Sequence, residues 1–89
     1  MVILSQDKTQ IINFDNIVYL WIQNPLENDN AEFEIVTETD GISTGIGFYK
    51  TEERAKEVLQ EIIGKYKKWN KDANNAVTII PKVYEMPEE

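Results

Sequence analysis

Three glutamates within residues 32–38 come closest in this sequence to a catalytic arrangement. Glu32, Glu34 and Glu38 stand at even spacing in a run that alternates polar with apolar residues. On a β-strand this spacing places all three side chains on one face. General acid–base catalysis needs two carboxylates held in different environments, and nothing in the neighbouring residues would separate these. The pattern therefore favours an exposed strand face over a catalytic pair.

The side chains that most often carry out catalysis or bind metals are missing from the sequence. The 89 residues include no histidine and no cysteine. This removes the commonest general base, the thiolate nucleophile and the usual ligands of zinc. It also leaves the serines without a histidine to activate them. We therefore expect a protein that is not an enzyme and that has neither a cofactor nor a metal ion.

Two glycines form a fragment of a phosphate-binding loop. Gly45 and Gly47 are not followed by a third glycine or by a Lys-Ser/Thr pair, and they do not open a helix. A bulged strand is the simpler explanation. An alternative function nevertheless stays open, in which an oligomer holds a nucleotide signal beside these glycines. Arg54, the one arginine, or Lys56 would then bind the phosphate.

The clearest element that could position these residues is a helix predicted over residues 51–69. Its apolar residues recur at intervals of three and four, which is typical of a helix with one buried stripe. Thr51 is placed to cap the helix, and Glu52 stands four residues before Lys56, a spacing that favours an ion pair. Because such a stripe must pack on something, we expect the helix to cover a sheet. The stripe consists of Ala55, Val58, Leu59, Ile62, Ile63, Tyr66 and Trp69.

The remaining segments predict short strands. Asp40-Gly41 is the strongest turn signal, suited to a two-residue hairpin. The run over residues 17–23 is apolar on both faces and is expected to be the central strand. The fold class is therefore α+β: an antiparallel sheet of about five to six strands with one long amphipathic helix packed on one face, in a single domain over residues 1–89. The expected strands cover residues 2–4, 10–14, 17–23, 32–39, 42–49 and 77–86.

One face of this sheet is a candidate binding surface. If the helix covers Val18, Leu20, Ile22, Phe33 and Ile35, the opposite face shows aromatic side chains beside acidic ones. Tyrosine and tryptophan bring a large contact area to a protein interface, and glutamates around them would select a basic partner. Alternatively, the last strand or a second copy of the chain covers the rings, so a homodimer stays open. The candidate partner-binding residues are Tyr19, Trp21, Glu32, Glu34, Glu38 and Asp40.

The charge of the chain is unevenly distributed. The net charge is −7, and residues 51–70 hold four Glu against one Arg and four Lys, so they carry +1 and the rest of the chain −8. Such a field repels nucleic acid and anionic membranes and favours a basic partner, although acidity also serves solubility alone. No apolar run reaches the roughly 20 residues that span a bilayer. The start of the sequence lacks the basic region of a signal peptide, so we expect a cytoplasmic protein.

Residues 11–17 and 47–62 resemble a family of small proteins of phages and prophages of low-GC Gram-positive bacteria, to which no chemistry is assigned. The resemblance implies an anti-defence role, such as an anti-CRISPR inhibitor acting in the host cytoplasm. Its partner would be a host protein with a basic surface, such as a nucleic-acid-binding defence effector, without direct contact to nucleic acid or membrane. The family supplies no site residues. The nucleotide-sequestering oligomer and a structural phage component remain the alternatives.

Overall fold

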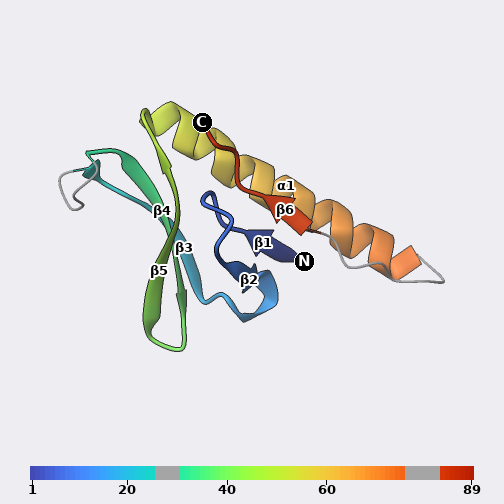
Figure 1. The fold of residues 1–89 in the computed structure, drawn as a ribbon. Helices are drawn as coiled ribbons and strands as arrows, with labels where there is room; N and C mark the ends of the chain where they lie inside the picture. The colour runs from blue at the N-terminus through green and yellow to red at the C-terminus, as the bar shows by residue number, and fades with distance from the viewer. Residues whose placement is uncertain (26–30, 76–82) are drawn as a thin grey trace.

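The computed structural model describes residues 1–25, 31–75 and 83–89, with helix side chains up to residue 68. Within these ranges six strands, one α-helix and a short 3-10 helix follow one another along the chain (Figure 1). The elements are β1 (Val2–Leu4), β2 (Ile11–Asn13), η1 (Phe14–Asn16), β3 (Tyr19–Gln23), β4 (Phe33–Thr39), β5 (Ile42–Tyr49), α1 (Glu52–Asn75) and β6 (Val83–Glu85).

The α+β class is confirmed, but the expected single sheet is wrong. The described strands form two sheets of three, in the orders β2-β1-β6 and β3-β4-β5. The second sheet is antiparallel throughout, whereas β1 pairs antiparallel with β2 and parallel with β6. The strands of the first sheet have only three residues each, so alternation in the sequence could not reveal which neighbours they would choose.

The order within the larger sheet also differs from the expectation. The run at residues 17–23 was expected at the centre of the sheet, but β3 is an edge strand and β4 lies between β3 and β5. Its two apolar faces have separate explanations. Leu20 and Ile22 pack against the core, while Trp21 lies opposite Val36 on the other face of the sheet. A strand such as β3 can therefore be apolar on both faces of the sheet and still lie at its edge.

The helix covers the predicted face of the sheet at Leu20, Ile22, Phe33 and Ile35. Val18 was predicted on the same face but is 65% exposed, because it precedes β3. Ala55, Val58 and Ile62 are fully buried, whereas Ile63 is exposed and is a wrong member of the predicted stripe. The helix continues to Asn75, beyond its predicted end; the side chain of Trp69 lies outside the described part. The core combines residues from the helix, from both sheets and from the segment after β6: Met1, Ile3, Ile35, Ile46, Tyr49, Ala55, Val58, Ile62, Tyr84 and Met86.

The hairpin of β4 and β5 contains the predicted turn and the predicted bulge. Asp40 and Gly41 both adopt positive φ angles, 50° and 80°, as a two-residue hairpin turn of this kind requires. Farther along, Ile35 pairs with Gly47 but Val36 pairs with Gly45, so the register shifts by one residue. The extra residue, Ile46, is buried in the core. Glycines in a bulged strand are therefore confirmed.

The two sheets are joined through Gln6 instead of a shared ladder. Its main-chain N–H donates to the carbonyl of Ile46 over 2.8 Å. Its side-chain amide accepts from the N–H of Phe48 at 2.7 Å and donates to the carbonyl of the same residue at 2.8 Å. The same amide nitrogen also donates to the carbonyls of Pro87 and Glu88. Gln6 thus occupies the outer edge of β5 and ties it to the segment that follows β6.

We predict that Gln6→Ala destabilises the protein much more than Gln10→Ala. The first change removes several hydrogen bonds at the junction and should lower the free energy of unfolding by about 2 kcal/mol. The matched control, Gln10→Ala, alters an exposed side chain of the same turn and should change it by no more than about 0.5 kcal/mol. Urea denaturation measures both variants. Equal stabilities for the two would contradict the role given to Gln6.

Candidate functional site

The outer face of the β3-β4-β5 sheet carries the aromatic and acidic side chains that the sequence singled out. The register places Tyr19 opposite Glu38 and Trp21 opposite Val36. Tyr19 is 63% exposed and Trp21 is half-buried. Val36 is buried although neither it nor Trp21 belongs to the core cluster. The face thus has a packed apolar centre beside an exposed tyrosine and a half-buried carboxylate.

Glu34 takes its position on this face from the bulge in β5. The space that a side chain at Gly45 would fill is occupied by the carboxylate of Glu34. Partial burial there raises the pKa of Glu34 above its ordinary value because desolvation disfavours the charged form. The glycine therefore leaves room for an acidic group that leans across the sheet, and that role is different from binding a phosphate.

The remaining two candidate binding residues lie away from this centre. Glu32 precedes β4 and lines a hollow of about 410 Å³ together with Lys50 and Arg54. Asp40 is exposed in the turn between β4 and β5, at the end of the sheet far from the start of α1 (Figure 1). Of the six candidates, the structure therefore brings four together, which we call the acidic sheet face: Tyr19, Trp21, Glu34 and Glu38.

The residues of the alternative nucleotide site do not converge. Gly45 and Gly47 line a hollow of about 90 Å³, while Arg54 lines the separate, larger one. Lys56 forms an ion pair with Glu52, 2.8 Å away, as the helical spacing predicted. Beside Gly47, the space that a side chain would take is crowded by Tyr49 and Met86. The structure thus divides the four residues among different surfaces.

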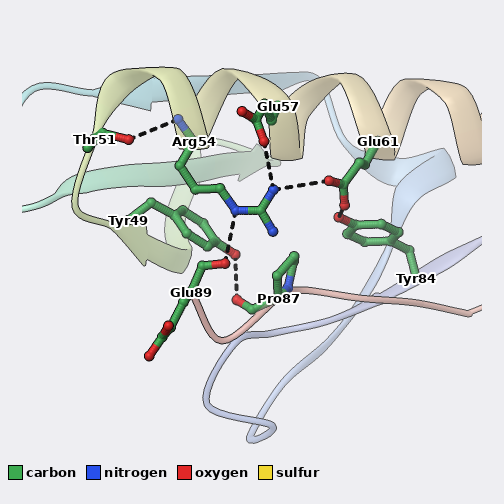
Figure 2. A network of polar contacts seen from close by, with 8 residues as sticks. All are labelled: Tyr49, Thr51, Arg54, Glu57, Glu61, Tyr84, Pro87 and Glu89. Carbon is green, nitrogen blue, oxygen red and sulfur yellow. Dashed lines mark hydrogen bonds and ion pairs between the residues drawn. The ribbon is translucent and has the colours of Figure 1, made fainter.

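Arg54 is part of a polar network that fastens the end of the chain to the helix (Figure 2). Its Nη1 lies 3.1 Å from a carboxylate oxygen of Glu57 and 3.2 Å from one of Glu61. Its Nε donates to the main-chain oxygen of Glu89 at 2.9 Å. The hydroxyl of Tyr84 donates to the other carboxylate oxygen of Glu61 at 2.9 Å. The ion pair of Arg54 with Glu57 has a helical spacing of three residues, but the sequence offered no signal for the contact with Glu89, which lies 35 residues away.

Tyr49 belongs to the same region and is held in its neutral form. Its hydroxyl donates to the carbonyl of Pro87 at 2.8 Å, and its ring is buried in the core. Burial raises the pKa of Tyr49 to about 12, while Arg54 lowers it slightly and Glu61 raises it. The phenol is therefore a hydrogen-bond donor across the ordinary pH range.

Ser5 and Lys8 have the Ser-x-x-Lys spacing of some acyl-transfer enzymes. The structure gives the serine a local role. Its hydroxyl donates to Asp7 at 2.7 Å and accepts the N–H of Gln10 at 3.1 Å. Ser5 is also buried. The hydroxyl thus closes the turn between β1 and β2, where a substrate has no access to it.

Comparisons with protein-family models, with curated proteins and with solved structures found no match for this chain. Among the described residues, no group of three or more acidic side chains is placed to hold a metal ion. No helix in the described ranges is long and apolar enough to cross a membrane. The candidate site therefore has to be interpreted from its own geometry.

We predict that alkaline pH destabilises the protein partly through Tyr49. An exposed phenol ionises near pH 10, whereas Tyr49 in the folded chain has a pKa of about 12. Between these values the unfolded state releases a proton that the folded state keeps, so stability falls as pH rises. Urea midpoints measured from pH 8 to pH 11 should fall less steeply for Tyr49→Phe than for the unaltered protein.

Tyr84 is expected to contribute to the same loss of stability at alkaline pH. Burial, together with the hydrogen bond to Glu61, raises its pKa as well, so Tyr49→Phe should keep part of the alkaline decline. Identical slopes for Tyr49→Phe and the unaltered protein would contradict the assignment.

Proposed function

We propose that this protein is a non-enzymatic inhibitor that binds another protein through the acidic sheet face. The target surface is basic, of the kind with which a host defence effector binds nucleic acid, and the inhibitor acts in the cytoplasm of the host cell. The observation that carries the proposal is the pairing of Tyr19 with Glu38 and of Trp21 with Val36 on adjacent strands. These pairs put aromatic contact area and negative charge side by side.

The packing of this face suits a binding surface. Trp21 lies against Val36, which is only 4% exposed, so part of the apolar surface is ordered before a partner arrives. Binding then costs less side-chain entropy than it would with a mobile ring. Tyr19 remains exposed and offers both an apolar ring and a hydroxyl. An ordered apolar centre with an exposed aromatic neighbour is a favourable arrangement for an interface hot spot.

The charge supports a basic target. Glu34 and Glu38 both lie on β4, next to the aromatic residues of β3. The whole chain has a net charge of −7, which steers it toward positive surfaces and away from nucleic acid. A protein of this kind competes with nucleic acid for the same basic groove. The resemblance of residues 11–17 and 47–62 to phage proteins supports a defence effector as the protein that contains this groove.

The nucleotide-sequestering alternative has less support from the geometry. Its glycines and its cations line different hollows. Arg54 is also occupied by Glu57, Glu61 and the main chain of Glu89. A nucleotide would have to displace these contacts before the guanidinium could bind its phosphate, and the arginine would then release the end of the chain.

The test is competition with DNA on purified RNA-guided nucleases. We expect the protein to displace fluorescent DNA from a susceptible nuclease, and Glu38→Lys to weaken this at least tenfold at low salt. The matched control, Glu85→Lys, makes the same charge change on β6 of the other sheet and should retain most of the inhibition. Raising the ionic strength should weaken the unaltered protein as well.

Two outcomes would contradict the proposal. If Glu38→Lys and Glu85→Lys inhibit equally well, the acidic sheet face is not the binding surface. If a broad panel of nucleases and other nucleic-acid-binding defence effectors keeps its DNA in the presence of the protein, the defence target itself is wrong.

A further inference from the structure

The two edges of the β3-β4-β5 sheet differ in how they are closed. At β5, the main chain and side chain of Gln6 occupy the carbonyl of Ile46 and both main-chain groups of Phe48. At β3, the sheet simply ends, and β4 is the only strand hydrogen-bonded to it among the described elements. An edge strand leaves main-chain donors and acceptors on its outer side available for another chain. Gln6 thus closes β5 over residues 46–48, whereas β4 is the one described strand that bonds to residues 19–22 of β3.

The sequence of β3 contains none of the usual protection against edge pairing. Residues 19–22 read Tyr-Leu-Trp-Ile, without charge and without proline. Their register with β4 is continuous, with no bulge to twist the edge away. Of the other described edge strands, β5 is partly closed by Gln6, and β2 and β6 have only three residues each, which is itself a form of protection. β3 is thus the edge best suited to receive a strand.

We propose that the basic partner binds as an added β-strand along the outer edge of β3, so that the sheet is extended to four strands. The inference rests on the proposed function and specifies its mode of recognition. Main-chain hydrogen bonds along residues 19–22 hold the added strand, and every second side chain of that strand lies on the acidic sheet face.

The charges on this face identify the kind of strand that fits. A lysine or arginine beside Tyr19 on the added strand lies next to an exposed ring, a favourable position for a cation. Its long side chain extends toward Glu38, which is paired with Tyr19 on the next strand. A strand that alternates basic with apolar or small residues therefore satisfies both the edge and the face.

A second copy of the chain is a poorer occupant of the same edge. Residues 17–23 contain no basic residue, so a β3-to-β3 pairing would place no cation beside Tyr19. It would also bring together two acidic sheet faces on chains that each carry −7. Like charges in this arrangement repel. A partner strand with basic side chains avoids both problems.

The test uses an octapeptide that alternates lysine with valine, and two N-methylated forms of it. One form is methylated on the lysine nitrogens and the other on the valine nitrogens. Only one of these sets faces β3 in an added strand, because main-chain N–H groups point alternately to the two sides. We expect the unmethylated peptide and one methylated form to shift the NMR signals of β3, and the other form to bind at least tenfold more weakly.

A lysine substitution at an exposed position of β3 tests the added strand independently of the methylated peptides. Tyr19→Lys should weaken peptide binding at least tenfold, since it removes the ring and adds a like charge. The matched control, Ile11→Lys, makes the same kind of change on β2, where the side chain is 74% exposed, and should leave binding within about twofold.

The possible results separate this inference from the function on which it rests. If both methylated forms bind like the parent peptide, strand addition is wrong while binding by the acidic sheet face stands. If none of the peptides binds, or if Glu38→Lys leaves peptide binding unchanged, neither the added strand nor the acidic sheet face is supported. If sedimentation shows a dimer that Tyr19→Lys dissociates, the occupant of β3 is a second copy and the inference is overturned.

Discussion

The arrangement of the molecule depends on how the outer edge of β5 is satisfied. A strand there would have merged the six described strands into one sheet, but the main chain turns away after β1, and Gln6 bonds to the main chain of β5 in its place. Its amide imitates a strand residue, accepting from and donating to Phe48. The bulge at Ile46 presents a further carbonyl to it. One side chain thus replaces a ladder, and both sheets are free to pack at an angle over the same helix (Figure 1).

The elements that depend on residues close together in the sequence could be predicted from it. The helix follows from its apolar stripe, the hairpin from Asp40-Gly41, and the bulge from two closely spaced glycines. The division into two sheets could not be predicted, because the second partner of β1 comes from a distant part of the chain. Its parallel neighbour, β6, lies 81 residues away in register, from Val2 to Val83. A strand of three residues is too short for its sequence pattern to predict such a pairing.

The candidate site likewise has a part that the sequence predicted and a part that it did not. Alternation placed Tyr19, Trp21, Glu34 and Glu38 on one face, and the register of β3 with β4 agrees. Glu32 stands at the same two-residue spacing as Glu34 and Glu38. It nevertheless lies before the strand begins, where it lines a hollow together with Arg54. Arg54 is a phosphate ligand only in the alternative hypothesis, and in the structure its Nε bonds to the main chain of Glu89 at the end of the chain. Spacing within a strand or a helix can be read in a sequence, as for the ion pair of Glu52 with Lys56, whereas the contact of Arg54 with a residue 35 positions away cannot.

The pairing of β1 with β6 has a consequence for the order in which the chain folds. The strands of the β3-β4-β5 sheet pair with their neighbours in the sequence, whereas β1 also pairs with a strand near the opposite end of the sequence. The acidic sheet face can therefore form while the other sheet is still incomplete. From the sequence separation we expect β6 to pair last and to complete the core beneath a surface that is already assembled on its outer side.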